Sequence, residues 1–108
     1  MTRYIYWDQI PSREYLNFTV EDIDDEAVVI VRDGSYDVTA VLALMVALEA
    51  SDGSTDAGFV YCENDNSVTV FDDGTDVLTL AVAANGQATL QRTAGTMTFD
   101  ITFHAVWI

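Results

Sequence analysis

The sequence predicts an all-β fold, a single antiparallel β-sandwich or flattened barrel of about eight strands. The clearest strand is Met97–Trp107, where apolar residues alternate with Thr98, Asp100, Thr102 and His104. This period of two is typical of a strand with one buried face. Turn-forming pairs also recur at short intervals, as in sandwiches: Asp33-Gly34, Asp52-Gly53, Asp73-Gly74, Asn85-Gly86 and Ala94-Gly95. Half of the 108 residues are apolar, so one core can form without disulfides.

Three strands are predicted in the first third of the chain. Residues 3–8 form an aromatic strand that Pro11 ends, with Tyr4 and Tyr6 on one face and Ile5 and Trp7 on the other. Residues 15–20 form the second, with three positions facing the core: Leu16, Phe18 and Val20. The acidic run 21–26 is expected to be a solvated loop. Residues 27–32 are β-branched on both faces and predict a central strand.

Residues 36–50 fit two structures. The run from Ala40 to Leu48 contains good helix formers, with Asp37 as an N-cap and Gly53 near a C-terminal stop, which favours a helix over 38–50. The same run is apolar all round, and a small domain cannot surround such a helix with core. We therefore expect a long strand buried on both faces, with the helix as the alternative.

The remaining strands are expected to follow one another as hairpins. They cover residues 59–63, 67–71, 77–83 and 88–92 and lead into the last strand. Short connections predict an antiparallel meander in one domain over 1–108, with one long crossover near residues 21–25.

The charge balance disfavours several classes of partner. Eighteen acidic residues face four arginines, there is no lysine, and the net charge is −14. Such a surface repels phosphate, so nucleic acids and anionic membranes are disfavoured. The composition fits either a high-salt setting or a codon bias that replaces lysine, and the sequence does not separate them. Met1–Tyr4 does not begin a signal peptide, and no apolar run approaches the roughly 20 residues of a membrane helix, so we expect a soluble protein.

Candidates for catalysis are few, and we expect no enzyme. Nucleophilic catalysis needs a base beside Ser, Thr or Cys. The one histidine, His104, shares a strand face with Thr102 and Asp100, but the three would line up along the strand instead of converging in a cleft. Cys62 lies in an apolar run and is expected to be a buried, inert thiol.

Clusters of acidic residues raise the alternative of a calcium site. The acids fall into three groups: Asp22, Asp24, Asp25 and Glu26; Glu63 and Asp65; Asp72, Asp73 and Asp76. None has the twelve-residue spacing of an EF-hand loop. We expect no cofactor and solvated turn acids, with an ordered calcium ion as the alternative.

The N-terminal aromatic residues are candidates for a partner interface. Tyrosine, tryptophan and arginine dominate interface hot spots, and the first residues contain five of them: Tyr4, Tyr6, Trp7, Arg13 and Tyr15. Residues 1–14 could form an extended arm that adds to a partner's sheet; the alternative is a first strand of the domain's own sandwich. A carbohydrate-binding module using Tyr4 and Tyr6, with Tyr36 and Tyr61, is the other possibility.

The segment Leu90–Phe103 contains an Arg-Thr-x-Gly-Thr turn that leads into a threonine-rich strand. It resembles the closing hairpin of small β-sandwich accessory proteins of tailed-phage virions, such as capsid decoration (cement) proteins and fibre domains. The resemblance implies a non-enzymatic virion structural protein on the capsid surface, made in the host cytoplasm. It also implies a major capsid or other virion protein as partner and a homo-oligomer, often a trimer. The alternative is a carbohydrate- or protein-binding module.

Overall fold

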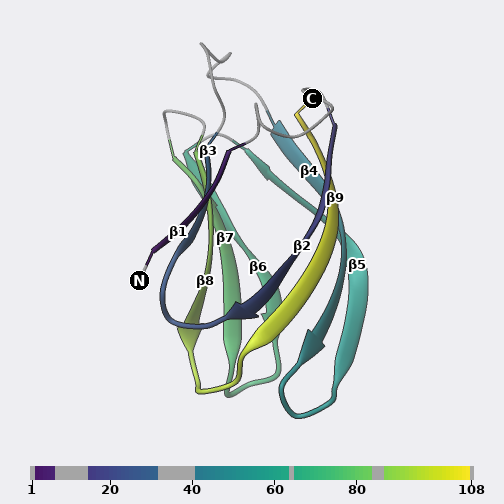
Figure 1. Ribbon diagram of the computed structural model, residues 1–108, viewed down its shortest axis with the longest axis vertical. Coiled ribbons are helices and arrows are strands. Elements are labelled where there is room, and N and C mark those ends of the chain that lie inside the picture. Colours follow the sequence, from purple (N-terminus) through teal and green to yellow (C-terminus); the bar gives the residue numbers. More distant parts are fainter. Residues whose placement is uncertain (1, 7–14, 32–40, 64, 84–86, 108) are drawn as a thin grey trace.

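The protein is described by a computed structural model over residues 2–6, 15–31, 41–63, 65–83 and 87–107. Nine strands and no helix occur in these ranges: β1 (Arg3–Tyr6), β2 (Tyr15–Ile23), β3 (Val28–Val31), β4 (Val41–Ala50), β5 (Thr55–Glu63), β6 (Asn66–Asp72), β7 (Val77–Val82), β8 (Ala88–Ala94) and β9 (Phe99–Trp107). They form a five-stranded sheet, β1-β3-β8-β7-β6, and a four-stranded sheet, β2-β9-β4-β5 (Figure 1). The predicted all-β sandwich is confirmed.

The core lies between the two sheets. It is formed by the buried residues that alternate with exposed ones along each strand. The first sheet contributes Val28, Ile30, Leu78, Leu80, Val82, Ala88 and Leu90, and the second contributes Val20, Ile23, Val46, Leu48, Ala50, Cys62, Phe99, Ile101 and Phe103. The sheets meet through aromatic contact, since the ring centroids of Phe71 and Phe99 are 5.1 Å apart. Period-two burial puts every second residue into this layer.

The predicted meander holds only in part. Strands β6, β7 and β8 are consecutive neighbours, and β4 and β5 form a hairpin. Elsewhere the chain changes sheets repeatedly, and β1 pairs with β3 in parallel. The meander with one crossover is therefore wrong. The alternation of apolar and polar residues specifies which face of a strand is buried but not which strand lies beside it. The strand order could therefore not be predicted from it. Strand β9 lies between β2 and β4, as expected for a long terminal strand.

Residues 41–50 form strand β4, so the helix over 38–50 is wrong where the structure describes it. The prediction that both faces of this strand are buried is also wrong for residues 45–50. Val46, Leu48 and Ala50 are buried, whereas Met45, Ala47 and Glu49 are exposed. Over residues 45–50 the outer side of the strand is left open to solvent, so an apolar sequence on both sides of β4 does not mean two covered faces.

The acidic run 21–26 is only partly a loop. Strand β2 continues to Ile23, which is fully buried, after a shift in its pairing with β9 between Val20 and Ile23. Asp22 at this bulge has φ of 55°, and its N–H donates to Asp100 Oδ1 at 2.9 Å. A bulge changes the phase of the alternation, and this phase change turns Ile23 into the core.

None of the described elements is a helix long and apolar enough to cross a membrane.

Candidate functional site

The outer face of the four-stranded sheet carries three large exposed apolar side chains. Met45 on β4 is opposite Phe59 on β5, and Tyr61 follows Phe59 on the same side of that strand. Their exposed fractions are 61% for Met45, 64% for Phe59 and 59% for Tyr61. We call this surface, with Ala47 and Ala57 beside it, the apolar face. Clustered exposure of this kind on a small protein marks a binding surface more often than scattered apolar residues do.

A shallow hollow of about 540 Å³ lies within the apolar face. Its floor is formed by the small residues Ala47, Ala57 and Gly58, and its walls include Met45 and Phe59. The pairing of Ala47 with both Ala57 and Thr102 explains the hollow, because three small or polar residues in one row leave a gap between larger neighbours. His104, opposite Met45, and Thr102 line the side towards β9.

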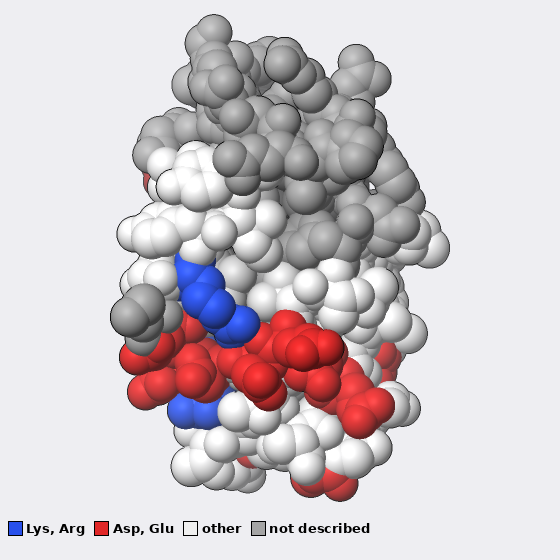
Figure 2. Space-filling view, viewed as in Figure 1, with Lys and Arg blue, Asp and Glu red and all other residues white. Residues whose placement is uncertain are grey.

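The end of the sheet beside the apolar face is acidic. Glu49 on β4 lies opposite Asp100 on β9, and both are exposed. Like charges directly opposite each other in a sheet destabilise it. In Figure 2 carboxylates form a band across the face shown, at the level of the β2–β3 connection, with arginine atoms beside it. Among the described residues, Arg92 Nη2 and Asp25 Oδ1 are 4.0 Å apart.

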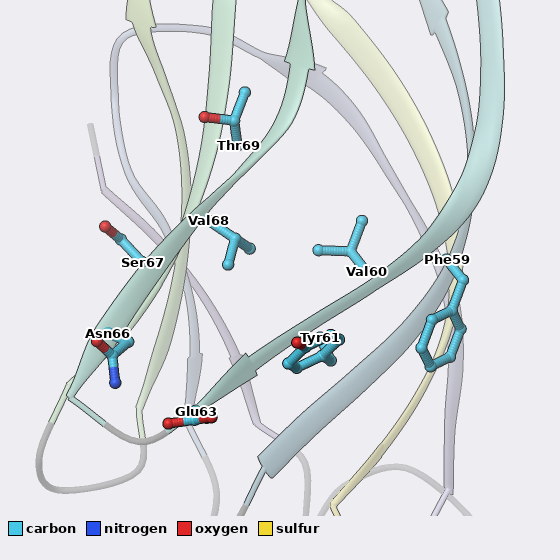
Figure 3. Close-up of a pocket in the computed structure, with 8 residues that line it drawn as sticks. All are labelled: Phe59, Val60, Tyr61, Glu63, Asn66, Ser67, Val68 and Thr69. Carbon is cyan, nitrogen blue, oxygen red and sulfur yellow. The ribbon is translucent and has the colours of Figure 1, made fainter.

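A second hollow, of about 500 Å³, separates the edge strands β5 and β6. Figure 3 shows Val60 of β5 and Val68 of β6 pointing towards each other across it, while Phe59 and Tyr61 lie on the other side of β5. The remaining lining residues are polar: Glu63, Asn66, Ser67 and Thr69. The sandwich is thus open along this side.

The groups considered for catalysis are engaged in structural contacts. Asp100 accepts the Asp22 N–H, and the Thr102 and Thr19 hydroxyls are 2.9 Å apart. Cys62 is fully buried, and its thiol donates to the Asn66 carbonyl at 3.2 Å. Burial raises the pKa of this thiol, so the nucleophilic thiolate is disfavoured. Cys62 is buried, as expected.

The acidic turns use their carboxylates as backbone acceptors. Asp52 accepts from the Ser54 hydroxyl and N–H, and these hydrogen bonds lower its pKa. Asp73 accepts from the N–H groups of Asp76 and Thr75, with the same effect on its pKa. Within the described ranges no group of three or more His, Cys, Asp and Glu side chains could hold a metal ion.

Five residues were predicted to form a partner interface. Those that the structure describes do not form one cluster. Tyr4 and Tyr6 are 58% and 45% exposed on β1, which pairs with β3 in the protein's own five-stranded sheet. Tyr15 pairs with Val106 in the four-stranded sheet, and its side chain lies outside the described part. Trp7, Arg13 and Tyr36 lie outside the described residues altogether.

Sequence reasoning missed Met45 and Phe59. A usable signal was present, because Phe59 and Tyr61 alternate with Val60 and Cys62 and must share a face of β5. The position of Met45 opposite Phe59 depends on the register of β4 with β5, which the sequence did not predict.

No protein-family model matches the chain, and neither a curated protein nor a solved structure is similar enough to it to count as a match.

Proposed function

We propose that this protein is a non-enzymatic structural protein that binds a protein partner through the apolar face. The observation that carries the proposal is the exposure of Met45, Phe59 and Tyr61 next to one another on a rigid sheet. Aromatic residues and methionine are enriched at the centres of interfaces, where their large side chains bury extensive apolar area. The hollow between them would receive a protruding side chain of the partner.

The charge of the protein supports a partner with a basic surface. Glu49 and Asp100 face each other beside the apolar face, and a lysine or arginine of a partner would relieve their repulsion. The net charge of −14 would also steer a basic partner towards the protein and speed association. Binding should therefore weaken as salt is added.

The resemblance of residues 90–103 to virion accessory proteins suggests the kind of partner and the place where this protein acts. In that setting the partner is a major capsid or other virion protein, and this chain decorates or cements the capsid surface. The segment includes part of β9, whose Thr102 lines the hollow of the apolar face. A decoration protein needs a folded scaffold and a binding surface, and the β-sandwich with its exposed apolar face supports this proposal.

The test begins with the genes beside the one that encodes this chain, where a major capsid or tail gene is expected. Particles assembled from that capsid protein are then mixed with the purified chain and sedimented. The double variant Met45→Thr/Phe59→Thr is expected to bind at least about tenfold more weakly, because it removes two interface anchors. Threonine keeps the strand propensity of both positions.

The matched control is Tyr4→Thr/Tyr6→Thr, which removes two exposed side chains from the other sheet. It should bind like the unmodified protein. Loss of binding in this control with full binding by Met45→Thr/Phe59→Thr would reject the apolar face and support the N-terminal aromatic residues. Absence of binding by the unmodified protein to these particles would reject the virion setting.

Carbohydrate binding is the second candidate, favoured by one specific arrangement. Phe59 and Tyr61 stand on the same side of β5 and border the hollow between β5 and β6, whose other lining residues are Val60, Val68 and four polar residues (Figure 3). Sugar rings stack on such aromatic pairs while their hydroxyls bind polar groups. A glycan array separates the candidates: binding that Phe59→Ala and Tyr61→Ala abolish would favour a sugar, with Tyr4→Ala and Tyr6→Ala as the comparison.

A further inference from the structure

Among the strands that the structure describes, four lie at the edges of a sheet, and an edge strand presents backbone groups that can pair with another strand. The edges are β1 and β6 in the five-stranded sheet and β2 and β5 in the four-stranded sheet. Natural proteins protect such edges by making them short, by bulges, or by charged residues. The four edges of this protein differ in that respect.

Three of the edges carry a protective feature. Strand β1 has only four residues. Strand β2 is bulged between Val20 and Ile23, and the Arg3 guanidinium donates to the Glu21 and Asp22 carbonyls at this bulge. Strand β6 has a register shift between Thr69 and Phe71. Bulges twist an edge and interrupt its ladder, so these strands are poor templates for pairing.

Strand β5 is neither short nor bulged, and its protection is limited to its first residues, where the Asp56 carboxylate accepts the Ala57 N–H at 2.8 Å. It runs for nine residues in unbroken register with β4, from Thr55 to Glu63. It contains no lysine, arginine or proline, and its two carboxylates, Asp56 and Glu63, lie near its ends. Residues 57–62 between them are uncharged, and most of the strand is exposed. A long edge with an unbroken register and an uncharged centre is a site for strand addition.

Gly58, in the middle of β5, leaves room for another backbone. A Cβ built at this position would have no heavy atom within 4 Å. Glycine inside a strand weakens it and often marks a place where another backbone comes close. Beside it, Val60 and Val68 line the open gap between β5 and β6, where a further strand would bury them (Figure 3).

We propose that β5 is a dimerisation edge, and that it pairs in antiparallel fashion with β5 of a second copy of this chain. An antiparallel strand is complementary to itself about a two-fold axis. With Phe59 on the axis, Gly58 lies opposite Val60 of the second copy, Thr55 opposite Glu63, and Asp56 opposite Cys62. All nine residues are paired and no two carboxylates face each other.

The pairing joins the four-stranded sheet of one copy to the four-stranded sheet of the second copy, so that the two form one continuous sheet. The outward side chains of both β5 strands, including Phe59 and Tyr61, then lie on one surface. The inference concerns the backbone edge and stands without the proposed function. A two-fold dimer also differs from the trimer that the virion resemblance implies. The number of copies in the assembly, once measured, distinguishes the dimer from the trimer.

The acidic surface makes this dimer dependent on salt. Each copy carries a net charge of −14, so two copies repel at low ionic strength. The screening length falls from about 10 Å at 0.1 M salt to about 3 Å at 1 M. Association through an uncharged strand should therefore strengthen with potassium chloride, whereas binding of a basic partner should weaken.

The test is sedimentation velocity of the full chain in 0.1 M and 1 M potassium chloride, with the variant Gly58→Lys. We expect a monomer–dimer equilibrium that shifts towards the dimer in 1 M salt. Gly58→Lys should weaken it by at least about tenfold, because a charge at the centre of the strand pair cannot be solvated there. The variant lowers the net negative charge, so its effect cannot come from added repulsion.

The control is Tyr4→Lys, which makes the same charge change at an exposed position on β1, an edge strand of the other sheet, and should leave the dimer intact. A monomer or trimer in 1 M salt, or equal effects of the two lysines, would overturn the proposal. Amide hydrogen exchange of the unmodified protein gives an answer even if Gly58→Lys does not fold. Association should slow exchange in residues 55–63, and protection of β1, β2 or β6 in their place would contradict it.

Discussion

Asp76 and Gly95 hold two turns of the sandwich together. Asp76 is 6% exposed, and its carboxylate accepts the N–H groups of Thr96 and Met97 at 2.7 and 2.9 Å. The β6–β7 turn is thereby fixed to the β8–β9 turn. Gly95 has φ of 88°, and a Cβ there would stand 1.9 Å from Asp76 Oδ1. The turn needs glycine both for its backbone conformation and for the approach of this carboxylate.

We therefore expect Gly95→Ala to destabilise the protein much more than Gly53→Ala does. Gly53 also has φ of 88°, but no atom lies within 4 Å of the place a Cβ would take. Its substitution should cost only the strain of a left-handed alanine, about 1 kcal/mol. Gly95→Ala adds the displacement of Asp76 and the loss of its hydrogen bonds, about 2 kcal/mol more. Urea unfolding measures both; equal losses would contradict the role of Asp76.

At the scale of the element, β4 shows that apolar composition and burial are different properties. Both of its faces are largely apolar in sequence, yet Val46 and Leu48 are buried while Met45 and Ala47 are exposed. The core lies on one side only, because the second sheet covers one face of the first. The exposed side became the apolar face, on which the proposed function depends.

Leu48→Ala and Met45→Ala are expected to separate the two faces of β4. Leu48 is 4% exposed and lies in the core, so its truncation should cost about 2–5 kcal/mol through lost burial and a cavity. Met45 is 61% exposed, and its truncation should change the free energy of unfolding by no more than about 0.5 kcal/mol. Chemical denaturation provides the comparison. A large loss in Met45→Ala would mean that the outer face is covered in the isolated protein.

At the scale of the whole molecule, the chain folds although its eighteen carboxylates repel one another. Several of them accept backbone N–H groups in turns, as Asp52 and Asp73 do. Such bonds favour the charged form of the carboxyl group, which is why both pKa values lie below the ordinary 3.8. The acids are thus part of the turn structure as well as of the surface charge.

The lowered pKa values predict how stability changes in acid. A carboxyl whose pKa is lower in the folded state stabilises the fold above its unfolded pKa, and this stabilisation is lost as pH falls through the folded pKa. Stability should therefore decline below about pH 4. The variant Asp52→Asn/Asp73→Asn keeps the turns, since asparagine forms them too, but should show a shallower decline between neutral and acidic pH. Parallel curves in thermal unfolding would contradict this assignment.

The candidate site was only partly predictable from the sequence. Tyr61 was available as an exposed aromatic residue, and the pairing of Phe59 with it on one side of β5 follows from alternation alone. Met45 could not be assigned, because its place depends on the register of β4 with β5. The free edge of β5 was equally hidden, since a sequence does not show which strands lie at the border of a sheet.

The sequence by itself determined that the chain is built of strands, roughly where most of them begin and end, and that its surface is strongly acidic. These properties follow from local alternation, turn residues and composition. The tertiary structure decided that β1 lies parallel to β3, that β9 lies between β2 and β4, and that Met45, Ala47 and Glu49 of β4 are exposed to solvent. The reason is that strand pairing joins residues far apart in the chain, and the buried face of one strand does not encode its neighbour.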